Sequence, residues 1–252
     1  MKLRRAPWLI IICLAAIRVG STENVQDAKT LMNAMRSRYE KSWYDTMTFT
    51  QKSTTYNPDG TNKVETWYEA GSLPGKLRID FGPPSEGNGA LFTGGKQILF
   101  EKGKETKNQP RLNILLVIGF DVYRQAPETT LAQLKQEGFD VTKFHEDVWK
   151  GEAVYVVGAD KGDVKSKQLW IERKRLLFMR LIEPDSHDAK NVNDIRFEDY
   201  RQLQKAWIAA RVEVYSNEKL VFTEDYSDIQ GDVKLPEAIF DPKEFRTAHW
   251  EK

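Results

Sequence analysis

The feature that most constrains the fold is a long succession of short segments in which apolar and polar side chains alternate. The clearest is Lys76–Phe81, where Leu, Ile and Phe alternate with Lys, Arg and Asp. Turn sequences such as Asn57–Gly60 and Gly94–Gly95 separate these segments. Strict alternation is typical of a strand with one face on a core and the other in water. We therefore expect antiparallel strands, each joined to the next by a tight turn.

The predicted strands fall into two groups, residues 43–103 and residues 139–229, with a different kind of sequence between them. Leu112–Phe120 is almost continuously apolar but too short to cross a bilayer. It is either a fully buried segment or an apolar element lying in a concave sheet, and periodicity alone does not separate the two. Thr129–Glu137 predicts a short helix.

A longer helix is predicted near the N-terminus. Apolar residues recur at helical spacing from Val25 to Tyr39, and Ser21 or Thr22 can cap the helix. Its apolar stripe must pack on another element. We expect a mainly β (α+β) fold: one large antiparallel sheet of roughly ten strands that curls or closes. The N-terminal helix and the short middle helical segment then cover one face and leave a concave apolar surface.

The first twenty residues have a different character. Lys2, Arg4 and Arg5 precede the apolar run Trp8–Ile17, and small residues follow at Val19–Ser21. A positive start, a short apolar core and small exit residues are typical of a cleaved secretory signal peptide. We predict a signal peptide at residues 1–20 and one exported domain at residues 21–252. Cys13, the only cysteine, lies inside the apolar run, so the mature domain has no disulfide and lipidation is not expected.

Composition and motifs argue against several functions. Thirty-eight basic and 37 acidic side chains give a net charge of +1, which disfavours nucleic acid as a partner. Three histidines leave little material for a metal site, and His145–Trp149 lacks the second histidine of a zinc protease motif. We predict no catalytic residue, metal or cofactor. A glycosidase with dispersed carboxylates stays open, although Glu172 and Glu183 stand out no more than other acidic pairs.

The second half of the chain contains a series of motifs: 149–158 (WKGEAVYVVG), 168–172 (QLWIE), 176–181 (LLFMRL), 197–200 (FEDY), Trp207-Ile208 and 240–242 (FDP). This series resembles the LolA-like periplasmic lipoprotein carrier superfamily, the outer-membrane lipoprotein-sorting proteins. The resemblance implies a half-open antiparallel barrel whose mouth is plugged by helices and whose concave apolar face takes up acyl chains.

The resemblance also implies which residues line that face. The expected lining is Leu77, Ile79, Phe81, Leu169, Ile171, Leu177, Met179 and Leu181. The alternative is that these are ordinary core residues beneath the helices, since a ligand face and a core share one composition. Arg78 is the candidate for the arginine with which such carriers hold their closed state. Extra loops at residues 160–167 and 185–193 indicate a member of the superfold rather than the housekeeping carrier.

The predicted function is a non-enzymatic periplasmic carrier or binding protein that shelters a lipid or lipoprotein acyl chain. Its expected partners are that acyl chain and a protein of the inner or outer membrane. One alternative is a non-catalytic protein-binding or envelope-sensing module of the same fold. A second alternative is an exported hydrolase.

Overall fold

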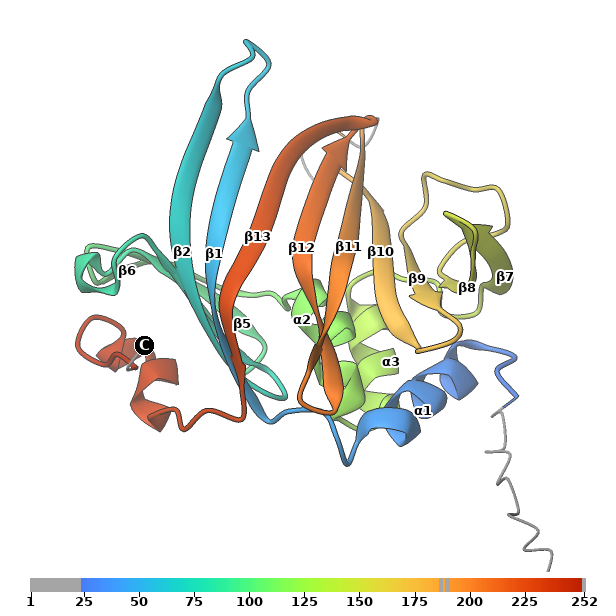
Figure 1. Cartoon of the computed structure of the whole chain (residues 1–252), viewed down its shortest axis with the longest axis horizontal. Coiled ribbons are helices and arrows are strands. Elements are labelled where there is room, and N and C mark those ends of the chain that lie inside the picture. Colours follow the sequence, from blue (N-terminus) through green and yellow to red (C-terminus); the bar gives the residue numbers. More distant parts are fainter. Residues whose placement is uncertain (1–23, 186–187, 189–190, 251–252) are drawn as a thin grey trace, which may run out of the picture.

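A computed structural model describes residues 24–185, 188 and 191–250, which form one antiparallel sheet of thirteen strands. The predicted signal peptide, and with it the boundary at residue 20, lies outside the described residues. The strand order is β6-β5-β4-β3-β2-β1-β13-β12-β11-β10-β9-β8-β7. The first and last strands therefore meet in the middle of the sheet, and β6 and β7 are its two open edges (Figure 1).

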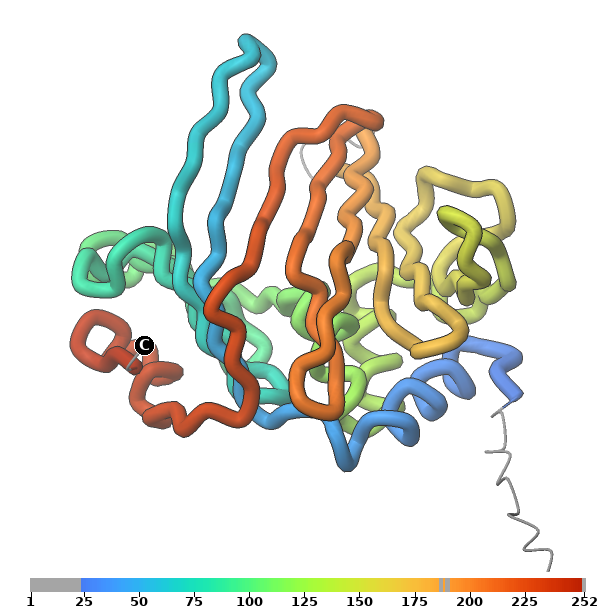
Figure 2. The backbone as a smooth tube through the Cα atoms, in the orientation of Figure 1, coloured from blue at the N-terminus to red at the C-terminus, as the bar shows by residue number. Residues whose placement is uncertain are grey.

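Two meanders build this sheet. The first consists of β1 (Thr46–Tyr56), β2 (Asn62–Ser72), β3 (Lys76–Phe81), β4 (Gly89–Thr93), β5 (Lys96–Glu101) and β6 (Lys104–Pro110). The second consists of β7 (Phe144–Trp149), β8 (Glu152–Val157), β9 (Gln168–Glu172), β10 (Leu177–Pro184), β11 (Val192–Leu203), β12 (Ala206–Ser216) and β13 (Lys219–Gly231). Figure 2 shows the β1–β2 hairpin rising beyond its neighbours. The prediction of a single large, curved, antiparallel sheet that does not close is confirmed, with thirteen strands rather than roughly ten.

The turns have the backbone conformations that their sequences predict. Asn217 and Glu218, between β12 and β13, both have positive φ, at 48° and 66°. Gly94 and Gly95, between β4 and β5, have φ of 57° and 73°. Two central residues with positive φ match the right-handed twist of the flanking strands. These tight turns force each strand to pair with its neighbour in the chain.

The segment between the meanders crosses from one edge of the sheet to the other. It contains α2 (Ile114–Gly119), the 3-10 turn η2 (Asp121–Tyr123) and α3 (Pro127–Gln136). Asn113 caps α2 by accepting hydrogen bonds from the backbone N–H groups of Leu115 and Leu116, both at 3.1 Å. We call the sheet face that these helices cover the inner face. α2 packs into the core there, so the apolar run at 112–120 is an element lying against the curved sheet (Figure 1).

The N-terminal helix α1 (Ala28–Tyr39) joins α2 and α3 on the inner face. Its cap is Asp27, whose side chain accepts from the Thr30 N–H at 2.7 Å while the Thr30 hydroxyl accepts from the Asp27 N–H at 3.1 Å. The prediction of a cap at Ser21 or Thr22 is wrong, because the helix begins later and a reciprocal capping box forms at Asp27.

The outer face has a small core of its own beside β3–β5. The C-terminal segment, with the 3-10 turns η3 (Glu237–Phe240) and η4 (Pro242–Glu244), packs there. The Phe100 and Phe245 rings stack with centroids 4.0 Å apart. This second core explains why both faces of β4 are buried.

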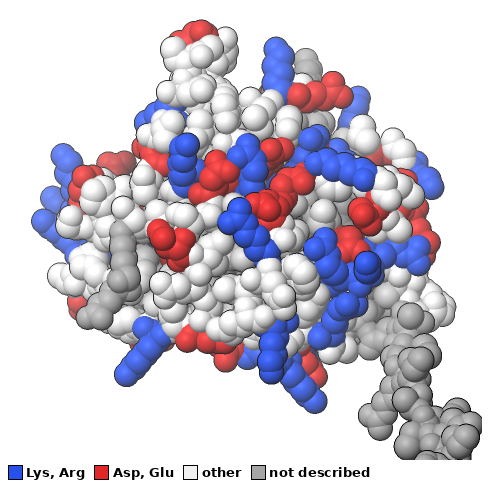
Figure 3. Space-filling model, viewed as in Figure 1, with Lys and Arg blue, Asp and Glu red and all other residues white. Residues whose placement is uncertain are grey.

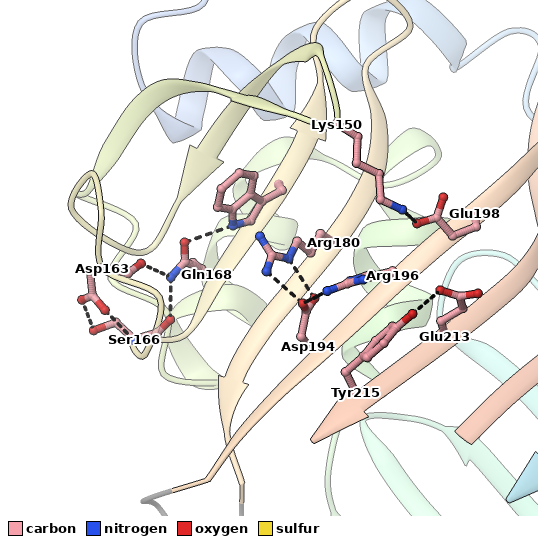
Figure 4. A network of polar contacts seen from close by, with 11 residues as sticks. Lys150, Asp163, Ser166, Gln168, Arg180, Asp194, Arg196, Glu198, Glu213 and Tyr215 are labelled. Atoms are coloured by element: carbon pink, nitrogen blue, oxygen red, sulfur yellow. Dashed lines mark hydrogen bonds and ion pairs between the residues drawn. The ribbon is translucent and has the colours of Figure 1, made fainter. Parts of the chain in front are cut away.

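Elsewhere the outer face carries charge. Asp194 on β11 accepts from the Arg180 guanidinium at 2.8 Å twice and from Arg196 at 2.7 and 3.1 Å, as Figure 4 shows. The Arg180 guanidinium also lies 4.8 Å from the centroid of the Trp170 ring. Figure 3 shows basic and acidic side chains mixed over this side of the molecule. Because the charges pair locally, this surface offers no concentrated positive field to a phosphate backbone.

Two segments differ from the sequence predictions. β6 is a strand that the alternation rule missed, because residues 104–110 are almost all polar. Lysines and a proline on an open edge hinder pairing with other chains, which is a common arrangement for an edge strand. Residues 139–143, predicted to begin the next strand, form turns instead, and β7 starts at Phe144.

Candidate functional site

Rows of apolar side chains cross the inner face from strand to strand. One row runs through the cross-strand neighbours Leu169, Leu181, Ile195, Val214 and Phe222, on β9 to β13. Residues directly opposite each other in antiparallel strands point to the same face. The inner face is therefore a continuous apolar surface across five strands, and the helices lie on it.

The structure places seven of the eight predicted lining residues in the inner-face core: Leu77, Ile79 and Phe81 on β3, Leu169 and Ile171 on β9, and Leu177 and Leu181 on β10. The eighth, Met179, is half-buried and lies at an irregularity in the pairing of β9 with β10. A bulge there shifts the alternation, so that Phe178, which is fully buried, faces Ile171. No signal in the sequence marks this bulge.

Burial divides the predicted lining residues. Leu77 is 5% exposed, and the β9 and β10 members of the core are at most 1% exposed, so they lie beneath the helices. Ile79 and Phe81 keep some exposed surface. Most of the predicted lining is thus the packed floor of the inner face, and open space lies at its ends.

A cleft of about 960 Å³ opens at one end, between α1 and the strands β7 to β9; we call it the α1 cleft. Its size is within the usual range of small-molecule sites. Figure 1 shows α1 lying beside this end of the sheet. The α1 cleft is lined by Asn24, Val25, Ala34, Ser37, Arg38, Glu146, Glu152, Ala153, Tyr155, Glu172, Arg173, Lys174 and Leu176.

Apolar and charged groups are segregated in the α1 cleft. Ala34, Tyr155 and Leu176 are buried and form its floor, whereas Arg173 and Glu146 are exposed at its rim and pair at 2.6 Å. The Arg173 guanidinium also lies 4.9 Å from the centroid of the Tyr155 ring. An apolar floor beneath a charged rim suits a ligand with an apolar body and a polar end.

Glu172 and Glu183, the acidic pair considered in the sequence, are both held in structural roles. Glu172, 3% exposed, accepts from the Arg175 backbone N–H at 3.0 Å and from its guanidinium at 2.8 Å, which closes the turn after β9. Glu183 pairs with Lys167 at 3.2 Å, near the opposite end of β10. The two carboxyls therefore do not form a glycosidase pair.

The other end of the inner face holds acidic and aromatic side chains that sequence reasoning missed. Glu69 on β2 is 6% exposed, and burial raises its pKa well above the ordinary value. Burial likewise raises the pKa of Glu224 on β13 to about 7. The sequence did contain one signal for this acid. Glu69 is two residues from Trp67 in a predicted strand, so the two side chains point to the same face of the sheet. In a chain rich in carboxylates, that signal does not stand out.

Arg78 lies on the opposite face from its apolar neighbours. It is fully buried, pairs with Asp80 at 2.9 Å, and donates to the backbone carbonyls of Phe245 at 2.8 Å and Ala248 at 2.7 Å. The interpretation of Arg78 as the arginine that closes the mouth is wrong, because alternation along β3 directs it to the outer core. There it holds the C-terminal segment.

The remaining motif residues have local partners. His145 lies in β7, with Nδ1 3.1 Å from the Ala159 carbonyl. Within residues 24–185, 188 and 191–250, no three His, Cys, Asp or Glu side chains are grouped to hold a metal ion. Across the same ranges, no helix has both the length and the apolar character needed to span a membrane.

No protein-family model and no curated protein matches this chain. Solved structures do. A DUF1329 family protein from Desulfovibrio piger has a TM-score of 0.57 at 15% identity, covering 85% of this chain and 95% of its own. A LolA superfamily protein from Nitrosomonas europaea has a TM-score of 0.53 at 16% identity, with 86% and 98% covered. An outer membrane lipoprotein-sorting protein domain from Vibrio parahaemolyticus has a TM-score of 0.55 at 17% identity, with 86% and 97% covered.

These likenesses extend over most of each chain and show the fold. The sheet and its covering helices share the fold of these three proteins, one of which is a LolA superfamily protein, and the sequence resemblance implied a fold of this kind. At 15–17% identity, the comparison concerns the fold and not the ligand.

Proposed function

We propose that this protein is an exported, non-catalytic carrier or binding protein that shelters a lipid or lipoprotein acyl chain in the α1 cleft. The observation that carries the proposal is the cleft itself, with about 960 Å³ of space between α1 and the sheet. Its floor is apolar and its rim is charged. An amphiphile would place its acyl chain on the floor and its polar end at the rim.

The floor of the cleft is continuous with the apolar inner face. Tyr155, which lines the cleft, is the cross-strand neighbour of Ile171, a member of the inner-face core. Burying one methylene contributes about 0.8 kcal/mol, so a long acyl chain contributes on the order of 10 kcal/mol before the costs of ordering are subtracted. A site of this size can therefore hold a lipid reversibly without a specific polar anchor.

The fold and the N-terminal sequence support the same proposal. Proteins of this fold include a domain described as lipoprotein-sorting. The predicted signal peptide directs the chain to the periplasm, where acyl chains need shelter from water to move between membranes. We propose that location, with outer-membrane lipoprotein sorting or lipid trafficking as the process.

The test is to block the α1 cleft. Ala153 lines the cleft and is exposed on β8, so Ala153→Trp adds bulk without disturbing the core, and strands tolerate Trp well. Val64→Trp is the matched control, because Val64 is 56% exposed on β2 and does not line the cleft. Uptake of a fluorescent fatty acid and native mass spectrometry of delipidated protein are the measurements.

We expect Ala153→Trp to weaken uptake by about tenfold or more, and Val64→Trp to leave it unchanged. Equal binding by both variants would exclude the α1 cleft as the acyl site. A wild-type protein that takes up no lipid from vesicles would refute the carrier function itself.

One observation favours a second candidate, a protein-binding module. β7 is an open edge of the sheet, and Val148 within it is 64% exposed. An extended segment of a membrane protein could add to this edge as a further strand. Val148→Lys should abolish such pairing and leave acyl binding intact, with photocrosslinking from position 150, in the turn after β7, as the measurement. Crosslinks that persist in Val148→Lys would exclude the edge as the docking site.

A further inference from the structure

Two carboxyl groups on the inner face have no positive partner. Glu69 on β2 is 6% exposed, and Glu224 on β13 is half-buried. In the described part of the chain, no lysine or arginine stabilises either one. By contrast, the other deeply buried acid of this half of the sheet, Asp80, is paired with Arg78. Buried carboxylates without a counter-ion are costly, so their presence on an apolar face calls for an explanation.

The two carboxyls face the same side of the sheet, on the two strands that flank β1. Phe49 is the cross-strand neighbour of Glu69, and Ser53 is that of Glu224, so Gln51 lies between them on the same face. Gln51 is fully buried and its Nε2 donates to the Ser53 hydroxyl at 2.8 Å. Its Oε1 has no hydrogen-bond partner. An orphaned buried acceptor therefore lies beside two uncompensated acids.

Aromatic rings surround these polar groups. The Trp67 ring lies 4.6 Å from Phe81 and 5.9 Å from Phe222, measured between centroids. Phe49 and Tyr226 form a second pair at 4.3 Å, and the Tyr226 hydroxyl donates to Glu224. Trp67, Phe81 and Phe222 are only half-buried, so part of each ring is open to a ligand. Ring faces attract cations.

Both acids bind their protons unusually tightly. Burial is the main cause: it raises the pKa of Glu224 to about 7, although hydrogen bonds from Tyr226 and Gln51 favour its ionised form. Burial, and then the neighbouring Glu224, raises the pKa of Glu69 further above its ordinary value. A cation placed between the two acids would replace a proton and supply the missing charge.

We propose that this acid–aromatic patch, formed by Gln51, Trp67, Glu69, Phe222, Glu224 and Tyr226, binds a primary alkylammonium group. The Glu224 carboxylate balances its charge while Glu69 keeps its proton, and Gln51 Oε1 accepts one of its N–H bonds. The open rings of Trp67 and Phe222 pack against its alkyl chain and its positive charge. Trp67 Nε1, at the edge of this patch, also has no hydrogen-bond partner.

The site is distinct from the α1 cleft, with which it shares no lining residue, and the inference does not depend on the proposed function. The competing arrangement is a structural one, in which each carboxyl keeps its own proton and both stay neutral. That arrangement leaves Gln51 Oε1 without a partner. It also predicts no preference for amines, which makes the two arrangements separable.

The experiment compares decylamine with decanol by titration calorimetry on the mature protein, at concentrations below those at which the amine forms micelles. Because the two probes have the same alkyl chain, the difference between their affinities measures the contribution of the ammonium group. We expect decylamine to bind about tenfold tighter or more. Near pH 6, where Glu224 holds its proton, titration in buffers of different ionisation enthalpy should show release of a proton on amine binding.

Two variants locate the site. Glu224→Gln should weaken the binding of decylamine by about tenfold and abolish the release of a proton, while the binding of decanol stays unchanged. Phe222→Leu keeps the apolar volume but removes a ring, and should also weaken the amine selectively. Glu198→Gln, on the outer face, is the control and should change neither probe. Equal affinity for the two probes, or amine binding without proton release in the wild type, would overturn the proposal.

Discussion

A single buried carboxyl on η2 allows a quantitative test of how burial acts in this fold. Asp121 is 1% exposed and accepts a hydrogen bond from the Gly75 N–H at 3.0 Å through Oδ1. Its other carboxyl oxygen is buried and has no hydrogen-bond partner. Burial raises the pKa of Asp121 from 3.8 to about 7, against the lowering effect of the Gly75 hydrogen bond. Asp121→Asn keeps the acceptor for Gly75 and removes the titration.

The sign follows from proton linkage. Between about pH 4 and pH 7 the folded protein holds the Asp121 proton while the unfolded chain has lost it, so wild-type stability falls as the pH rises. The interval from 3.8 to about 7, at 1.36 kcal/mol per pH unit, corresponds to at most about 4 kcal/mol. Asp121→Asn carries none of this dependence. The variant should therefore gain stability relative to the wild type across that window and keep a constant advantage above it.

Urea unfolding at one-unit pH steps measures this difference. Because Glu69 and Glu224 titrate in both proteins, their effects cancel in the comparison. Asp140→Asn is the control: hydrogen bonds from Thr142 lower the pKa of this exposed carboxyl, so its variant should show the opposite sign. Parallel stability curves for wild type and Asp121→Asn would refute the assignment of Asp121 as a buried, protonated acid.

Three other substitutions test the structural roles of Arg78, Gly89 and Asp194. Arg78→Ala should cost about 3–5 kcal/mol by leaving a buried carboxylate unpaired, and should expose residues 235–250 to trypsin; an unchanged digestion pattern would contradict its anchoring role. Gly89→Ala should lower the melting temperature, at a cost of about 1–3 kcal/mol, because its Cβ would lie 2.1 Å from the Ile79 carbonyl oxygen. Asp194→Ala removes the carboxylate shared by Arg180 and Arg196 and leaves the two guanidinium groups to repel each other. High salt screens that repulsion, so the loss of stability should be smaller at high salt than at low salt. A loss of stability that does not depend on salt would argue against the repulsion.

Much of the architecture could be predicted because the side-chain pattern of most strands agrees with the face that each residue takes in the structure. Alternation in Lys76–Phe81 correctly assigned Leu77 and Ile79 to one face, and glycine or asparagine turns correctly predicted the hairpins. The same rule failed at Met179, because a bulge shifts the register by one residue and changes which side chain faces the core. It also failed for β6, because a polar edge strand has no buried face to produce alternation.

The candidate sites were less predictable than the fold. Most of the residues predicted to line a ligand site lie in the packed floor of the inner face, and their role in binding stays a prediction. The α1 cleft depends on where α1 stops covering the sheet, and its lining comes from α1 and from the strands β7 to β9, which follow more than 100 positions later in the sequence. Glu69 and Glu224 are 155 positions apart and share one face of the sheet only because β1 lies between β2 and β13.

By itself, the amino-acid sequence determined most of the elements and their faces, because strand alternation, turn conformation and helix periodicity depend on a few neighbouring residues. It also determined that the chain, with a single cysteine, has no internal disulfide, and it determined the balance of charge. The tertiary structure alone decided that β1 pairs with β13, that the 111–143 segment covers the inner face, and that the C-terminal segment covers part of the outer face. These outcomes depend on burial summed over contacts between distant segments, and no local pattern encodes such a sum. Clefts and uncompensated charges arise where that packing is incomplete, which is why the structure was needed to find them.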